Sequence, residues 1–194
     1  MILRFLRSIL TFFFEIAETA ILAILIFLAL YLFLVRPHQI RGDSMLPNFH
    51  NGEYLLTEMV SYNLLKNDPQ RGEVVVFRSP EQPNLDFIKR IIALPGEKVK
   101  LQNGKVFIVN EDNPEGFLLE EDYLEEGTAT EGRRTIKEGE TFETGEGYVV
   151  MGDNRERSSD SREWGAINKE SVIGKVWLRY WPSEAVALIK PAIY

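Results

Sequence analysis

Ser44 and Lys89 are the residues of this chain best suited to covalent chemistry. Ser44 lies in the segment GDSMLP at 42–47, and Lys89 follows 45 residues later in the apolar run FIKRII at 87–92. A serine hydroxyl needs a base to become a nucleophile, and a lysine kept neutral by burial can serve as that base. The pair indicates cleavage of peptide bonds, and the hydrophobic N-terminal segment predicts that this happens at a membrane.

Lys89 is a candidate base only if its amine is buried. In a strand it shares a face with Phe87 and Ile91, whereas Arg90 points to the opposite face with Ile88. The commoner fate of such a lysine is to extend along apolar surface until its amine reaches water. If Lys89 is buried instead, desolvation lowers its pKa and frees the amine, which a guanidinium does not allow.

Ser44 has a plainer interpretation, because a serine beside Gly, Asp and Pro is usually a turn former. Its neighbours Met45 and Leu46 are apolar, which favours a segment packed against a pocket wall. Gly42 has no side chain and allows a substrate to approach the backbone, and the Ser44 amide is placed to donate to an oxyanion.

The loop MGDNRERSSDSREWG at 151–165 is the third candidate. Such a mixture of Ser, Asp and Arg either holds itself together by side-chain hydrogen bonds or orients a lysine amine. A histidine triad and a metal site are both unsupported, because the chain has only His38 and His50 and no cysteine. We expect no metal and no other cofactor.

The elements that must position these residues are short strands. Asn103-Gly104 is a strong hairpin signal, and no stretch after residue 41 has a long helical period. The sequence therefore predicts an all-β domain of short antiparallel strands. The expected strands lie at 53–57, 73–77, 87–94, 98–101, 106–109, 147–151 and 172–181.

Residues 19–35 contain no charge, Gly or Pro, and the apolar residues before them extend the run. This predicts one transmembrane helix. A cleavable signal peptide is the alternative, but the run is too long and no small-x-small site follows before Arg36-Pro37. We expect an anchor at 1–36 and a catalytic β domain at 37–194, with about 97–147 as a reduced accessory segment. Flanking arginines give no orientation.

Charge excludes one class of partner. Residues 1–41 carry a net charge of +2 and the remainder −9, which together give −7. Such an acidic domain is a poor match for nucleic acid, which needs clustered Lys and Arg. The segment 111–131 holds nine acidic residues among 21. We interpret it as a solvated surface excursion.

Four motifs, in this order, resemble those of bacterial type I signal peptidases, which are serine proteases with a serine–lysine dyad. They are GDSMLP at 42–47, RGEVVVF at 71–77, DFIKRIIALPGE at 86–97 and GDNRxxSxDSRxWG at 152–165. Each is weak alone, but the set is highly specific and extends from the anchor to near the C-terminus. The resemblance implies a folded-leaf β domain.

The resemblance also implies roles for the matching positions. Ser44 is the implied nucleophile, Lys89 the general base, and Ser158 the hydroxyl that orients the lysine amine, while Gly152 leaves room beside it. Many members have Ser or Thr two residues before the nucleophile as an oxyanion donor. Here Gly42 stands there, so the oxyanion hole would depend on backbone amides.

Supporting and substrate-binding positions follow from the same resemblance. Asp160 and Arg162 match a supporting ion pair, and Asp153 matches a partner for Arg90. The implied pockets, for small side chains at the first and third residues before the cut, are lined by Ile40, Met45, Phe87 and Ile88.

The function implied is removal of signal peptides from exported preproteins, with cleavage after small residues. The implied partners are those preproteins, the lipid bilayer and, by proximity, the secretion translocon. The implied location is the bacterial plasma membrane, with a cytoplasmic N-terminus and an extracytoplasmic domain. Two rivals stay open: self-cleavage, as in SOS-response repressors, and an inactive module that binds exported chains.

Overall fold

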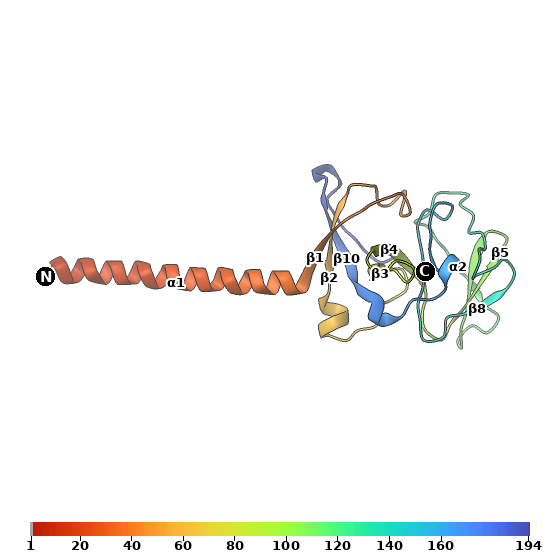
Figure 1. Cartoon of the computed structure of the whole chain (residues 1–194), viewed down its shortest axis with the longest axis horizontal. Coiled ribbons are helices and arrows are strands. Elements are labelled where there is room, and N and C mark those ends of the chain that lie inside the picture. The colour runs from red at the N-terminus through yellow and green to blue at the C-terminus, as the bar shows by residue number, and fades with distance from the viewer. Residues whose placement is uncertain (1) are drawn as a thin grey trace. The chain divides into compact units, whose positions relative to one another are not determined.

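The computed structural model describes residues 2–194, and their contacts divide the chain into two compact units between Arg36 and Pro37. The first unit is the helix α1 (Ile2–Leu34), drawn in red in Figure 1. Its segment Ile9–Leu28 has a mean hydropathy of 2.2 and is long and apolar enough to cross a membrane. None of that segment is buried inside the protein, as expected of a helix whose apolar side chains contact lipid.

The second unit is built from two antiparallel β-sheets. The larger has seven strands in the order β1-β2-β10-β3-β4-β9, with β11 paired to β10. Its strands are β1 (Val35–Gln39), β2 (Tyr54–Glu58), β3 (Val74–Arg78), β4 (Asp86–Ala93), β9 (Val149–Met151), β10 (Val172–Trp181) and β11 (Ala187–Leu188). The smaller sheet has the order β7-β6-β5-β8.

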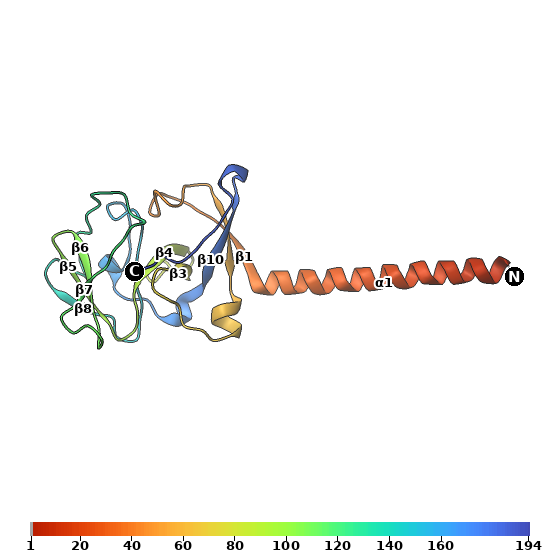
Figure 2. The ribbon, with the colours of Figure 1, turned by 180° about the vertical axis from the view of Figure 1, so that it is seen from behind.

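The smaller sheet is formed by β5 (Lys98–Gln102), β6 (Lys105–Val109), β7 (Phe117–Leu118) and β8 (Thr141–Glu143). The turn between β5 and β6 has positive φ at Asn103 and Gly104, as the sequence predicts for a tight hairpin. Figures 1 and 2 show this sheet on one side of the domain, β10 on the other, and β3 and β4 between them. The remaining elements are α2 (Ser161–Trp164) and the short turns η1 (Val60–Leu64), η2 (Lys169–Ser171) and η3 (Ser183–Ala185).

Strand β4 connects the hydrophobic clusters of the domain. Ile92 and Ala93 belong to a cluster shared with the smaller sheet, whereas Ile91 packs in a second cluster with Val75 and Phe77. A third cluster lies under the turn that carries Ser44 and contains Ile40, Met45, Phe49, Leu55, Val74, Val76 and Val176. Because both faces of β4 are buried from Lys89 to Ala93, a polar residue in that part of the strand needs a partner or changes its protonation.

The predicted all-β class is confirmed, since strands dominate residues 37–194. All seven expected strands are present with boundaries within two residues. The sequence reading missed β1, β7, β8 and β11. Strands β7, β8 and β11 are two or three residues long, too short for a period-2 pattern to be recognised. Strand β1 (VRPHQ) contains Pro37, which weakens a strand signal.

Candidate active site

Strand β4 places Lys89 and Arg90 on opposite faces of the larger sheet. Lys89 is paired in register with Val75 of β3, and Arg90 is paired with Val74 of β3 and Met151 of β9. Each residue is buried to the same degree, with 4% of its surface exposed. Lys89 therefore does not extend to water along apolar surface.

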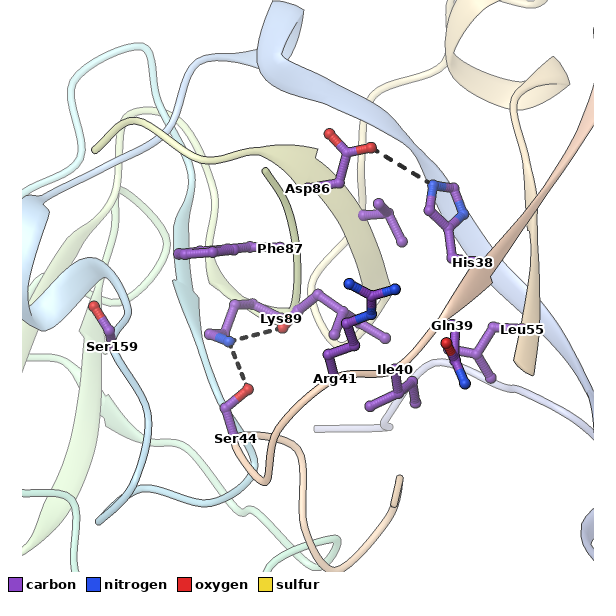
Figure 3. Close-up of a pocket in the computed structure, with 12 residues that line it drawn as sticks. His38, Gln39, Ile40, Arg41, Ser44, Leu55, Asp86, Phe87, Lys89 and Ser159 are labelled. Atoms are coloured by element: carbon purple, nitrogen blue, oxygen red, sulfur yellow. Dashed lines mark hydrogen bonds and ion pairs between the residues drawn. The ribbon is translucent and has the colours of Figure 1, made fainter. Parts of the chain in front are cut away.

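The Lys89 amine lies beside the Ser44 hydroxyl. Its Nζ is 2.8 Å from Ser44 Oγ and 2.9 Å from the carbonyl oxygen of Ile88, as the dashed lines in Figure 3 show. The Phe87 ring centroid lies 5.6 Å from the same nitrogen. The structure thus brings together the two residues that the sequence singled out, at hydrogen-bonding distance.

Burial lowers the pKa of Lys89 from 10.5 to about 8, while the carboxylates of Asp160 and Asp153 act in the opposite direction. Desolvation prevails because no ion pair reaches this amine among residues 2–194. A lysine with this pKa is partly neutral near pH 8, so its lone pair is available to take a proton.

The turn that carries Ser44 is fixed from two sides. Within the turn, the Leu46 amide donates to the carbonyl of Asp43 at 3.2 Å. From the loop that follows β9, the Asn154 amide donates to the carbonyl of Ser44 at 3.0 Å, and its side-chain Nδ2 donates to the carbonyl of Asp43 at 3.1 Å. The Gly42 amide is occupied by Asn51 Oδ1 at 3.0 Å. The turn that carries Ser44 and the loop that follows β9 are therefore one hydrogen-bonded unit.

The loop at 152–162 is organised by a buried carboxylate. Asp160 accepts from Arg162 Nε and Nη2 at 2.9 Å each and from the Gly152 amide at 3.1 Å. Burial opposes ionisation of Asp160, but the hydrogen bonds and charge of Arg162 outweigh it and lower the pKa of this carboxyl. A Cβ at Gly152 would overlap the Ser158 hydroxyl and the Ser44 carbonyl oxygen. Only glycine fits there.

Ser158 is buried next to Gly152, as the resemblance places it. Its Oγ has no hydrogen-bond partner that meets distance and angle criteria within residues 2–194, although Asp160 lies close enough for the hydroxyl to help lower the pKa of that carboxyl. The Lys89 amine bonds to Ser44 and Ile88 instead. The orienting role of Ser158 stays a prediction.

On the other face of β4, Arg90 forms a two-pronged ion pair with Asp153. Its Nε and Nη2 lie 2.9 Å and 2.6 Å from the two carboxylate oxygens, and its Nη1 donates to the carbonyl of Gly72 at 3.0 Å. Burial alone would lower the pKa of Arg90, but the hydrogen bonds and charge of Asp153 raise it. This side chain stays charged.

A cavity of about 250 Å³ opens beside Ser44 and Lys89 (Figure 3). Three of the predicted substrate-binding residues, Ile40, Phe87 and Ile88, line it. Met45 does not; it is buried in the cluster beneath the turn. The remaining lining residues are His38, Gln39, Arg41, Leu55, Val76, Asp86 and Ser159.

Comparisons with known proteins agree with this arrangement. The sequence matches the family described as "Signal peptidase, peptidase S26" over residues 13–181. The chain belongs to this signal peptidase family. It is 33% identical to signal peptidase IB of Staphylococcus aureus strain COL, covering 87% of this chain and 91% of that protein.

Two cyanobacterial signal peptidases are also similar. Probable signal peptidase I-2 of a Synechocystis strain is 32% identical, covering 90% of this chain and 76% of that protein. Probable signal peptidase I-1 of the same strain is 36% identical, covering 83% and 79%. As a signal peptidase, the chain is a serine peptidase that removes signal peptides from exported preproteins, and its apolar helix agrees with membrane anchoring.

The interpretation of segment 111–131 as a solvated surface excursion is wrong for the part of the segment around Glu121 and Tyr123. Glu121 forms an ion pair with the buried Arg155 of the catalytic-side loop, and Tyr123 stacks on Arg90 with its ring centroid 4.1 Å from the guanidinium carbon. The physical reason is that two buried guanidiniums need partners. A lone tyrosine in an acidic run was the signal available in the sequence.

The two histidines do not form a triad with Ser44. His38 lies at the far end of the cavity, where its ring is 3.0 Å from the Thr57 hydroxyl and 3.8 Å from Asp86 (Figure 3). His50 faces Glu53 at 3.5 Å. Within residues 2–194 no group of three or more acidic, histidine or cysteine residues is arranged to hold a metal ion.

Proposed function

We propose that this signal peptidase uses Ser44 as nucleophile and Lys89 as general base. The observation that carries the proposal is the 2.8 Å separation of Ser44 Oγ from the amine of Lys89, a residue that is 4% exposed and whose pKa lies near 8. In its neutral form this amine accepts the serine proton, and the Ile88 carbonyl, 2.9 Å away, takes one of its N–H groups. The lone pair is thereby directed at Ser44.

Each step couples a proton transfer to the making or breaking of a bond. Ser44 Oγ attacks the carbonyl carbon of the scissile bond as its proton passes to Lys89 Nζ. The Lys89 ammonium then protonates the leaving amine, the C–N bond breaks, and the signal peptide stays attached to Ser44 as an ester. Water then gives a proton to the neutral Lys89 Nζ as its oxygen attacks the ester carbon. The bond from that carbon to Ser44 Oγ breaks, the Lys89 ammonium returns a proton to Ser44 Oγ, and the signal peptide leaves as a carboxylic acid.

The negative oxygen formed in each attack needs a donor, and the Ser44 amide supplies it. Within residues 2–194 this N–H donates no hydrogen bond to another backbone group, whereas the Gly42 amide is occupied by Asn51. One backbone donor of this kind contributes about 10²–10³-fold in rate.

The substrate would lie extended beside residues 37–42 and add its backbone to that edge. Small side chains at the first and third residues before the cut would enter the cavity of about 250 Å³ that Ile40, Phe87 and Ile88 help to line. Asp160 and Arg162 would hold the loop, Ser158 would orient the lysine amine, and Arg90 with Asp153 would fix β4.

The proposed setting is the bacterial plasma membrane, with α1 as a single anchor in contact with lipid. Its N-terminus would be cytoplasmic and residues 37–194 extracytoplasmic, near the secretion translocon that delivers preproteins. What supports this is the apolar segment Ile9–Leu28 and the family of the chain.

The test uses the full chain in detergent with a preprotein that carries Ala-x-Ala before the cut. Ser44→Ala and Lys89→Met are each expected to lower cleavage by at least about 10³-fold while circular dichroism stays native. Lys89→Arg, the matched variant, keeps a cation that cannot deprotonate and is expected to be equally inactive. Near wild-type cleavage by any of the three would refute the role assignments, and saturable binding without product by the wild type would favour the binding module.

A further inference from the structure

Tyr123 lies in the acidic segment 111–131, in the connection between β7 and β8 of the smaller sheet, yet it contacts residues near both members of the proposed dyad. It is 34 residues beyond Lys89 and 79 beyond Ser44 in the sequence. None of the motifs of the resemblance includes it. Its contacts nevertheless lead to the strand that carries Lys89 and to the turn that carries Ser44.

On the lysine side, the Tyr123 ring covers the guanidinium of Arg90. The guanidinium carbon lies 4.1 Å from the ring centroid, well within cation–π range. Arg90 is the residue after Lys89 in β4, and its other contacts are the in-plane hydrogen bonds to Asp153 and Gly72. The ring therefore closes the face of Arg90 that those hydrogen bonds leave open.

On the serine side, the contact is made by the main chain of Tyr123. Asn48 Nδ2 donates to the Tyr123 carbonyl at 2.9 Å and to Asp153 Oδ2 at 2.9 Å. Asn48 lies four residues after Ser44, in a turn closed by the hydrogen bond from the Phe49 amide to the Met45 carbonyl at 3.0 Å. A shift of Tyr123 would therefore shift this turn.

Tyr123 is itself held by charged partners. Its hydroxyl donates to Glu121 Oε1 at 2.6 Å and accepts from Arg155 Nη2 at 3.0 Å. Arg155 also donates through Nε to the carbonyl of Gly152 at 3.1 Å, which ties the tyrosine to the loop. The Tyr194 hydroxyl lies 3.1 Å from that of Tyr123, and their rings meet edge to face.

We infer that Tyr123 is a positioning residue for the dyad: its ring holds the strand of Lys89 through Arg90, and its carbonyl holds the turn of Ser44 through Asn48. This inference rests on the proposed function of Ser44 and Lys89. Displacement of reacting atoms by about 1 Å can lower a rate by about 10²-fold. Loss of the ring should therefore affect the chemical step more than substrate binding.

The test compares Tyr123→Leu with the matched variant Tyr123→Phe in the full chain, with kcat and KM measured on the same preprotein. Tyr123→Leu is expected to lower kcat by about 10- to 100-fold and to change KM by no more than about twofold. Tyr123→Phe keeps the ring over Arg90 and is expected to retain kcat within about threefold, since it loses only the hydroxyl contacts. Rates are expressed per folded molecule, from near-ultraviolet circular dichroism at the assay temperature.

A second readout is the coupling between Tyr123 and Asn48. If both act through the relative position of strand and turn, the combined Tyr123→Leu/Asn48→Ala variant should lose less kcat than the product of the single losses. Should Tyr123→Leu fold incompletely, Tyr123→Met is measured by the same criteria.

Wild-type kcat in fully folded Tyr123→Leu would overturn the inference. So would a Tyr123→Phe variant that is as impaired as Tyr123→Leu, or variants whose KM rises while kcat is unchanged. These outcomes are distinguishable from failure of the proposed function. That failure would appear as residual cleavage by Ser44→Ala or Lys89→Met, whatever the Tyr123 variants do.

Discussion

The two faces of β4 bury neighbouring cations to the same extent and treat them in opposite ways. Lys89 and Arg90 are each 4% exposed. Burial lowers the pKa of Lys89 to about 8, whereas Asp153 raises the pKa of Arg90 against the effect of burial. One face yields a group that can exchange a proton, and the other yields a permanent charge.

The difference lies in where the carboxylates are. Asp153 forms a two-pronged ion pair with Arg90, and Asp160 is paired with Arg162, so neither forms an ion pair with Lys89. Burial alone is therefore not sufficient to activate a lysine. The carboxylates that hold the loop, Asp153 and Asp160, must also be paired with other cations. Arg90 and Arg162 are those cations.

The largest effect should follow from breaking the Arg90 face. Arg90→Met removes the partner of a buried carboxylate and is expected to destabilise the protein by about 3–5 kcal/mol. The measurement is denaturant unfolding of the full chain in detergent, followed by tryptophan fluorescence. Arg78→Met is the control, since Arg78 pairs with Asp86 on an exposed edge and should change stability by less than about 1 kcal/mol. Equal, small losses in both variants would show that the ion pair is not the support described.

Removal of the cation on the Lys89 face should change the free energy of unfolding in the opposite direction. Below pH 8 the Lys89 amine is charged in the folded and unfolded chain, and burying that charge costs about 3 kcal/mol for a shift from 10.5 to about 8. Lys89→Met is therefore expected to stabilise the inactive protein by up to this amount at pH 7.

That gain has a defined pH dependence. The wild type becomes more stable between pH 8 and 10.5, where the folded chain releases its proton before the unfolded one. The advantage of Lys89→Met should shrink across this window. Lys98→Met, at an exposed position paired with Glu143, serves as the control and should show neither effect. A Lys89→Met variant less stable than wild type at pH 7 would contradict the burial cost.

The smallest effect, and the sharpest test of the comparison, is the pH profile of cleavage. With a pKa of about 8, only about a tenth of Lys89 is neutral at pH 7. We expect kcat/KM to rise about tenfold from pH 7 to pH 9 and to fall about tenfold per unit below pH 7. A profile that is flat from pH 5 to pH 8 would exclude an amine as the base.

Much of this site could be predicted from sequence because its parts are local patterns. Alternation in 86–93 assigned Lys89 and Arg90 to opposite faces, and a tight turn around Ser44 followed from Gly42 and Pro47. The contacts of Tyr123 could not be predicted, because they depend on pairing across the fold with Arg90 and Arg155. Likewise, β8 covers only Thr141–Glu143 and has no recognisable period.

Met45 shows what a resemblance alone does not give. The family match implied that it lines a substrate pocket, whereas in the structure the residue is buried beneath the turn and 1% exposed, so its binding role stays a prediction. In a tight turn, adjacent residues point in unrelated directions, so proximity in sequence does not place a side chain on the same surface. Leu55, which lines the cavity, could be assigned only from the packed structure, whereas the resemblance had already implied Ile88.

The apolar wall of the small cavity also bears on how exported proteins diverge. Methyl-bearing walls such as Ile40, Leu55, Val76 and Ile88 sort what enters by bulk, and a single methylene changes the preference by about 1–3 kcal/mol. Under the proposed binding mode, a leader sequence can vary at nearly every position provided that two of its residues stay small. Exported proteins can thus differ widely in leader sequence and still be cleaved by one enzyme.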